Sequence, residues 1–211
     1  MRKNLNWEDR RIVLASGSPR RRELLQGLGW RFRVVVPEID ESPRAGESPE
    51  ELCLRLAAGK AQAVDGVGET ETLVIAADTI VVVDGDVLGK PAGEDESLRM
   101  IRRLQGRVHE VLTGMAVRWG KKISTGLERT RVRFRPLDEN AVRAYAETGE
   151  GMDKAGAYAI QGRGSLLVSS IEGDYFNVVG LPLCRLGAML EEMGLTLPRQ
   201  WEMGIQSRIQ R

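Results

Sequence analysis

The 211-residue sequence has few of the residues that build common metal and redox sites. It contains one histidine, so a zinc site made of repeated histidines is excluded. Its two cysteines, Cys53 and Cys184, lack the spacing of a metal motif. Because no secretory signal is apparent, we expect two free thiols in a reducing, cytoplasmic compartment.

The sequence also lacks a long apolar run and an excess of charge of one sign. The longest nearly apolar run, 73–83, is interrupted by Asp78 and Thr79 and is too short to cross a membrane. Lys and Arg number 31 and Asp and Glu number 30, so broad attraction to nucleic acid or to an anionic membrane is not expected. A local basic pocket is still compatible with these numbers.

Ordinary contents of hydrophobic (42%) and charged (29%) residues indicate a globular protein, and neither a repeat nor a linker is present. We expect one domain over residues 11–195. An N-terminal extension (1–10) precedes it, and a polar, loose C-terminal tail (196–211) follows it.

Strand and helix patterns alternate along the chain. Strands are predicted at 11–15, 32–36, 73–83, 108–119 and 123–134, and helices at 19–28, 49–64, 94–104, 139–149 and 183–194. Residues 165–171 and 175–179 are predicted to form a hairpin. Because 73–83 is apolar on both faces, it reads as a central strand. The pattern predicts a mixed sheet in an α/β (mixed α+β) fold.

The segment Ser16-Gly17-Ser18-Pro19-Arg20-Arg21 has the composition of a phosphate-binding turn. Small residues allow close approach to the backbone, and a helix start offers free N–H groups. It is not a P-loop, since no Gly-Lys-Ser/Thr follows, and G-x-G-x-x-G is absent from the chain. The alternative is a capped helix with solvated arginines. Arginines at a helix N-terminus oppose the helix dipole, which favours the anion-binding interpretation.

Asp78 and Lys60 are charged residues at apolar positions. An unpaired carboxylate in a covered strand costs several kcal/mol, roughly, so Asp78 is a structural salt-bridge partner or, as we favour, a metal ligand or general base. On a helical wheel that starts at Leu52, Lys60 falls at about 80°, in the middle of the apolar arc. It must therefore extend to solvent or meet an anion.

The other polar candidates carry little signal alone. Glu41 lies in an acidic loop, Lys90 in a turn and Gln161 in a glycine-bounded segment, and each is an ordinary surface residue on local sequence. His109 lies in a predicted strand, where packing or hydrogen bonding is a more natural role than catalysis.

Together these segments resemble the Maf family of nucleoside triphosphate pyrophosphatases. The matching stretches occur in family order from about residue 11 to 194: Leu14-Ala-Ser-Gly-Ser-Pro-Arg-Arg21, Ala77-Asp-Thr79, Leu88-Gly-Lys-Pro91, His109-Glu-Val-Leu-Thr113, Asp153-Lys-Ala-Gly-Ala-Tyr158, Ile160-Gln-Gly162 and Val179-Gly-Leu-Pro182. The resemblance implies an elongated mixed sheet with two lobes around a cleft, as in inosine triphosphate pyrophosphatases. It also implies hydrolysis between the α- and β-phosphates, a divalent metal (Mg or Mn) and a possible homodimer.

The resemblance assigns roles to individual residues. Ser16 and Arg21 fall on phosphate-loop positions, Glu41, Lys60 and Lys90 on further site positions, and Asp78 on that of the proton acceptor. Three positions separate the branches of the family, and here they hold Arg20, Thr79 and Gln161. The resemblance at these positions implies the branch that acts on dTTP and UTP and not the one that acts on 7-methyl-GTP.

The residues themselves are compatible with this activity. Glu41 and Asp78 could hold a metal together with substrate phosphates. A geometric tension remains, because adjacent residues in a regular strand point to opposite faces. Asp78 and Thr79 are therefore expected to line one site only if the strand ends or distorts there. The alternatives are a 7-methyl-GTP pyrophosphatase and a non-catalytic nucleotide- or RNA-binding regulator.

Overall fold

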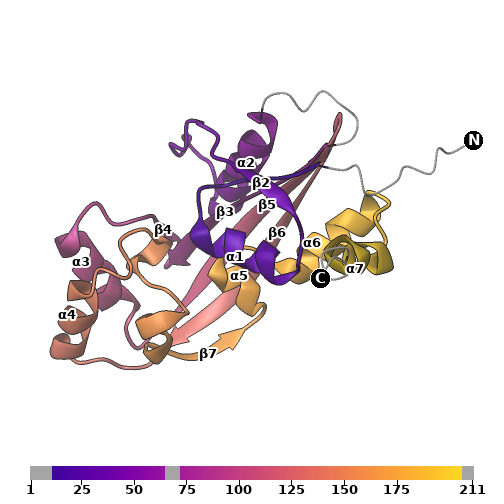
Figure 1. The fold of residues 1–211 in the computed structure, drawn as a ribbon. Helices are drawn as coiled ribbons and strands as arrows, with labels where there is room; N and C mark the ends of the chain where they lie inside the picture. Colours follow the sequence, from indigo (N-terminus) through magenta and orange to yellow (C-terminus); the bar gives the residue numbers. More distant parts are fainter. Residues whose placement is uncertain (1–10, 65–71, 206–211) are drawn as a thin grey trace, which may run out of the picture.

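The computed structural model describes residues 11–64 and 72–205, whose strands form one mixed sheet (Figure 1). The strands are β1 (Arg11–Ala15), β2 (Phe32–Val35), β3 (Thr72–Val83), β4 (Asp86–Leu88), β5 (Val108–Trp119), β6 (Lys122–Phe134) and β7 (Val168–Glu172). Their order is β2-β1-β3-β5-β6-β7, with β4 paired to β3. β1 runs parallel to β2 and β3, and the other pairs are antiparallel. The mixed sheet predicted from the sequence is confirmed.

The helices lie in two groups near opposite ends of the long strands, which makes the molecule elongated (Figure 1). One group contains α3 (Glu94–Leu104) and α4 (Glu139–Glu147). The other contains α2 (Pro49–Gln62), α6 (Leu183–Glu192) and α7 (Leu197–Ile205). α1 (Pro19–Gly27) and the short α5 (Tyr175–Val179) lie between them, and two 3-10 turns are η2 (Ala155–Ala157) and η3 (Gly162–Leu166).

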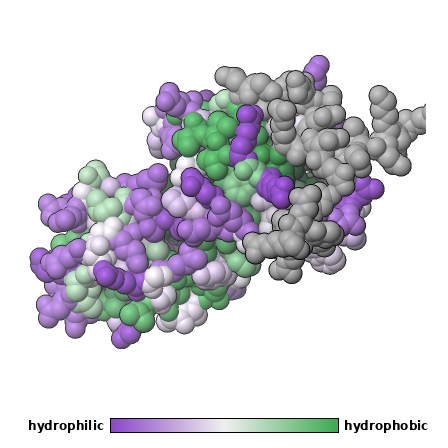
Figure 2. Space-filling model, viewed as in Figure 1, coloured by the Kyte–Doolittle hydropathy of each residue, from purple (hydrophilic) through white to green (hydrophobic). Residues whose placement is uncertain are grey.

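Side-chain caps begin three of these helices as expected from the sequence. Ser18, Ser48 and Asp138 each accept a backbone N–H of the first turn. In the view of Figure 2, hydrophilic residues cover most of the end that carries α3 and α4, and a hydrophobic area lies in the region of α2 and β2. Within the described ranges, no helix is long and apolar enough to span a bilayer.

Two expectations for the C-terminal part are wrong. The segment 175–179 is a helix and not a strand, because Asp174 caps it by accepting the N–H of Phe176 at 2.7 Å.

The second correction concerns residues 197–205, which form α7 and not a loose tail. The side-chain amide of Gln200 donates to Leu195 O and Gly187 O, both at 2.9 Å, and Trp30 Nε1 donates to Gln200 O at 3.1 Å. Residues 1–10 and 206–211, which include the predicted N-terminal extension, lie outside the described residues.

The two faces of β3 are covered by different helices. Val74 and Ala76 pack with residues of α2, whereas Ile75 and Ala77 pack with α1 and α6. α2 comes very close to the sheet at Gly114, which pairs with Asp78, since a Cβ there would lie 2.2 Å from Cys53 O. The missing side chain thus lets α2 pass directly over the Asp78 side of β3.

One edge of β3 is interrupted in its middle. β1 pairs with β3 as far as Ala15↔Ala76, and β4 begins to pair only at Val81↔Leu88. In the described part of the chain, no strand covers that edge over residues 77–80. The opposite edge pairs with β5 without a break. The interruption lies directly beside the turn that follows β1.

Candidate active site

Arg21 occupies the first turn of α1 and is buried beside the interrupted edge, with 8% of its surface exposed. Its Nε donates to Gly180 O at 2.7 Å, Nη1 to Ser16 Oγ at 3.0 Å and Nη2 to Thr79 Oγ1 at 2.9 Å. All three acceptors are neutral. Since a guanidinium has five N–H groups, one on each terminal nitrogen remains free of these contacts.

Arg21 has no carboxylate in direct contact among the described residues, and the charges of Asp78 and Glu41 act on it only from a distance. Burial lowers the pKa of its guanidinium, the charge of Asp78 raises it, and that of Arg20 lowers it again. The ion pairs found among the described residues do not include Arg21. Because a buried cation is costly without an anionic partner, this position is suited to bind an anion.

Gly180 is required where it accepts the Arg21 bond. It ends α5 with φ of 121°, a conformation that disfavours other residues. An added Cβ would lie 3.5 Å from Thr79 Oγ1 and 3.6 Å from Arg21 Nε, which is ordinary van der Waals contact. The backbone conformation, and not a lack of space, therefore favours glycine at this position.

On the other face of β3, Lys60 joins two carboxylates. Its Nζ lies 2.5 Å from Asp78 Oδ1 and 2.8 Å from Glu41 Oε1. The side chains of Lys60 and Asp78 are each 12% exposed. Of the two outcomes expected for Lys60, solvent or an anion, the structure shows the second, and the anions are carboxylates of the same chain.

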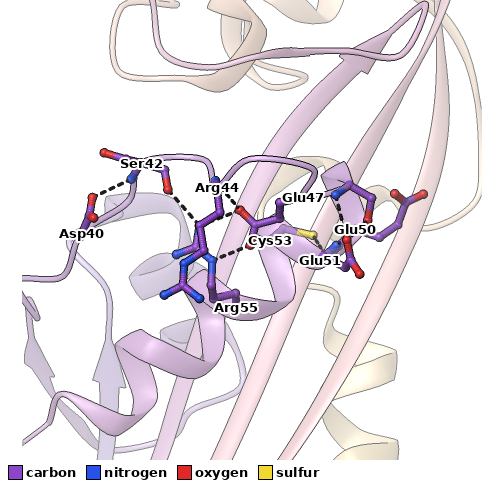
Figure 3. A network of polar contacts seen from close by, with 9 residues as sticks. Asp40, Ser42, Arg44, Glu47, Glu50, Glu51, Cys53 and Arg55 are labelled. Carbon is purple, nitrogen blue, oxygen red and sulfur yellow. Dashed lines mark hydrogen bonds and ion pairs between the residues drawn. The ribbon is translucent and has the colours of Figure 1, made fainter.

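The loop that carries Glu41 is fastened to α2 (Figure 3). Arg55 Nη2 donates to Ser42 O at 3.0 Å, and Arg55 Nε pairs with Glu47 Oε1 at 2.5 Å. On the other side of Glu41, Asp40 accepts the N–H of Ser42 at 2.9 Å. The neighbours of Glu41 are thus fixed, and its carboxylate is held over Lys60.

Glu41 is ionised in this setting. Burial alone would raise the pKa of Glu41, but the hydrogen bond and charge of Lys60, with the charges of Lys90 and Arg21, lower it overall. The bond from Arg55 lowers the pKa of Glu47 in the same loop to about 2. The loop therefore carries charged carboxylates at neutral pH.

Asp78 and Thr79 do point to opposite faces, and β3 neither ends nor distorts between them. The condition expected for a shared site, that β3 ends or distorts at these residues, is therefore not met. Both residues lie on the part of β3 whose edge carries no strand among the described residues. The charge of Asp78 acts on Arg21, which is bonded to Thr79, so the two sides are electrostatically connected.

The remaining predicted residues lie farther out. Arg20 Nη1 pairs with Asp153 Oδ2 at 3.2 Å. Lys90 is exposed and acts on Glu41 through its charge. Gln161 precedes η3 and is half-buried, and within the described residues no hydrogen bond joins it to the others. The structure thus brings together Ser16, Arg21 and Thr79 on one side and Glu41, Lys60 and Asp78 on the other.

Three residues behind Arg21 were not among the predicted site residues: Thr113, Asn177 and Gly180. Thr113 and Asn177 are fully buried. A polar residue within the apolar run 175–179 was the available signal for Asn177.

The packing role expected for His109 is confirmed, since its Nε2 hydrogen-bonds Tyr158 Oη at 2.8 Å and its ring contacts Phe134. Burial lowers the pKa of His109 to about 4.

The carboxylates fit a divalent cation that is shared with a phosphate ligand. Among the described residues, no group of three or more metal-ligating His, Cys, Asp or Glu side chains exists. Asp78 and Glu41 nevertheless converge on one point, which Lys60 Nζ occupies. Magnesium is commonly held by one or two carboxylates plus substrate phosphates, and this donor set matches that requirement.

Comparisons with known proteins show which proteins this chain is similar to. The family model described as Maf-like protein matches residues 11–193. A dTTP/UTP pyrophosphatase of Symbiobacterium thermophilum is 54% identical, over 87% of this chain and 94% of that protein. Proteins with the same name are 52% identical in Pelotomaculum thermopropionicum (87% of this chain, 96% of that one) and 48% identical in Myxococcus xanthus (92% and 98%). The solved Ham1 protein of Staphylococcus aureus aligns with 87% of this chain and all of its own, at 14% identity and a TM-score of 0.49.

Proposed function

The chain belongs to the Maf family, and from this premise we propose that it is a nucleoside triphosphate pyrophosphatase that acts on dTTP and UTP. It cleaves the anhydride between the α- and β-phosphates and releases the nucleoside monophosphate and pyrophosphate. The observation that carries the proposal is the buried guanidinium of Arg21, held only by neutral acceptors beside two carboxylates. The similar proteins named dTTP/UTP pyrophosphatase support the substrate class.

A triphosphate supplies the anion that Arg21 lacks. Its oxygens can accept the two remaining N–H groups of the guanidinium and the free N–H groups at the start of α1. Arg20, Lys60 and Lys90 add positive charge around it. Arg20 can exchange its exposed partner Asp153 for phosphate at little cost, because an exposed ion pair is weak.

Asp78 is the proposed general base. It is held by Lys60 and can orient a water molecule and accept its proton as the water oxygen adds to phosphorus. Pyrophosphate then leaves with the bridging oxygen. A magnesium or manganese ion held by Asp78 and Glu41 with the phosphates supplies Lewis-acid polarisation of the phosphoryl group when bound.

Recognition of the base is assigned to Gln161, with Arg20 and Thr79. The 4-oxo, 3-imino edge of uracil or thymine offers an acceptor beside a donor, and a glutamine amide can match both. Polar groups left unpaired by a different base would oppose its binding.

We also propose that the protein is cytoplasmic and that it forms a homodimer. Sedimentation would detect the homodimer as twice the 23.4 kDa mass of one chain.

A screen of nucleoside triphosphates tests the proposal. The protein is incubated with dTTP, UTP, CTP, dATP and 7-methyl-GTP in Mg²⁺ or Mn²⁺, and pyrophosphate and orthophosphate are measured separately. We expect pyrophosphate from dTTP and UTP. Orthophosphate with a nucleoside diphosphate would refute the reaction, and turnover of 7-methyl-GTP alone would move the chain to the other branch. Nucleotide binding without turnover would favour a regulatory module.

A further inference from the structure

A chain of hydrogen bonds runs from Arg21 into the interior, away from the substrate side. Arg21 Nη2 donates to Thr79 Oγ1 at 2.9 Å, and the hydroxyls of Thr79 and Thr113 lie 2.9 Å apart. Thr113 Oγ1 donates in turn to the backbone carbonyl of Asn177 at 3.2 Å. The chain thus links α1, β3, β5 and α5.

The proton positions along this chain follow from the chemistry of the groups. A guanidinium can only donate, so Thr79 Oγ1 accepts from Arg21. The Asn177 carbonyl can only accept, so the single proton of Thr113 is used there. With the Thr113 proton used at Asn177, Thr79 donates to Thr113 at 2.9 Å, and its other acceptor, Gly180 O, lies farther away at 3.5 Å. Removing the Thr113 oxygen leaves the Thr79 proton only the longer contact to Gly180 O.

Asn177 holds α5 against the sheet. It is fully buried, and its Nδ2 donates to Val111 O at 3.0 Å and to Thr130 Oγ1 at 2.9 Å. Thr130 Oγ1 also donates to Asp174 O and accepts the N–H of Asp174, both at 3.0 Å. The start of α5 is therefore fixed to β5 and β6, and α5 ends at Gly180, whose carbonyl holds Arg21 Nε.

We propose that Thr113 and Asn177 are positioning residues that set the orientation of the Arg21 guanidinium, Thr113 through Thr79 and Asn177 through Gly180. They touch neither the substrate nor the reacting atoms. The inference rests on the proposed function for the identity of the anion, but its geometry concerns only the binding of a polyphosphate to Arg21.

Two substitutions at Thr113 separate this role from packing. Thr113→Val keeps the branched shape and removes the hydroxyl, whereas Thr113→Ser keeps the hydroxyl and removes a buried methyl. A packing role predicts that the serine variant suffers more. A positioning role predicts the reverse order. Thr72→Val is the matched control, because it removes a buried threonine hydroxyl at the start of β3, the strand that pairs with β5.

The first experiment measures kcat/KM for dTTP, with thermal unfolding of each variant as the check of folding. We expect Thr113→Val to lose about 10- to 100-fold, the range for a buried hydrogen bond broken with one partner left unpaired. We expect Thr113→Ser and Thr72→Val to stay within about threefold of the wild type. A valine variant that stays within threefold, or a serine variant that falls as far as valine, overturns the inference.

The second experiment measures binding of inorganic triphosphate by calorimetry, so that it does not depend on turnover. Thr113→Val should weaken binding about tenfold in the wild-type background and by less than about threefold in Arg21→Ala. Equal weakening in both backgrounds shows that Thr113 does not act through Arg21 and overturns the inference. A wild type that binds triphosphate but releases no pyrophosphate from any nucleotide contradicts the proposed function alone.

Discussion

The two sides of β3 at the candidate site hold their cations in opposite ways. On the Asp78 side, Lys60 is paired with two carboxylates of the chain. On the Thr79 side, Arg21 is bonded only to neutral oxygens. The first arrangement has one more carboxylate than cations and so presents negative charge to a cation. The second leaves positive charge for an anion, so we expect substrate affinity to depend on Arg21 and turnover on Asp78.

The largest expected effect comes from removing the charge of Asp78. Asp78→Asn should lower the single-turnover rate with dTTP by about 10²–10⁴-fold, the usual contribution of a general base. Nucleotide affinity should change much less and can rise, because the carboxylate no longer repels phosphate. Rapid-quench measurements with equilibrium binding test this, and a variant with wild-type turnover would remove Asp78 from the proposed role.

At Arg21 we expect the opposite effect, with a larger loss of dTTP affinity than of turnover. Arg21→Lys keeps the charge but cannot make three bonds in fixed directions, so dTTP affinity should fall about 10- to 100-fold. The single-turnover rate at saturating dTTP should fall less than in Asp78→Asn. If Arg21→Lys binds dTTP normally and fails only in turnover, the division between the two sides is wrong.

A weaker effect is expected at the loop that holds Glu41. Arg55→Ala removes the bonds to Ser42 and Glu47, so Glu41 is less well placed and the apparent affinity for Mg²⁺ should fall about tenfold. Thr125→Ala, an exposed change on β6, is the control. The test is the rate of dTTP turnover measured as a function of Mg²⁺ concentration. If this dependence is unchanged in Arg55→Ala, the loop does not contribute to metal binding.

The same loop predicts a pH dependence of stability. The bond from Arg55, with a smaller effect of Arg44, lowers the pKa of Glu47 from 4.5 to about 2, so the pair contributes fully above about pH 4.5 and loses its contribution as the pH falls toward 2. The difference in melting temperature between wild type and Arg55→Ala should therefore shrink from pH 6 to pH 3. A difference that grows on acidification would contradict this assignment.

Several of these features could be predicted from local sequence. The position of Lys60 on its helical wheel indicated a charged group facing the sheet, and the helix starts at Ser18, Ser48 and Asp138 were readable as caps. Each depends on residues within one or two turns. The carboxylate partners of Lys60 could not be predicted from local sequence, because Asp78 lies 18 residues away on another element.

Other features depend on contacts that the local pattern does not contain. Residues 175–179 combine aromatic and β-branched side chains, which favour strand, but Asp174 caps them as a helix and Thr130 holds that cap. The interrupted edge follows from where β1 ends and β4 begins on β3, which is a matter of register between distant strands. The Thr113 to Asn177 bond spans 64 residues.

The smallest expected effect concerns a residue outside both clusters. Gln161→Ala should reduce the preference for dTTP and UTP over 7-methyl-GTP by about fivefold, the value of roughly one hydrogen bond, and leave phosphate binding unchanged. Competition assays with mixed nucleotides measure this ratio. If the ratio does not change, Gln161 does not read the base, and base recognition must be sought among other residues.

The structure of Asp78→Asn with dTTP and Mg²⁺ tests the division between the two sides most directly. We predict phosphate oxygens about 3 Å from Arg21 Nη1 and Nη2, with the metal between the phosphates and Glu41. A triphosphate bound away from Arg21, with the guanidinium still held only by Gly180, Ser16 and Thr79, would contradict the account.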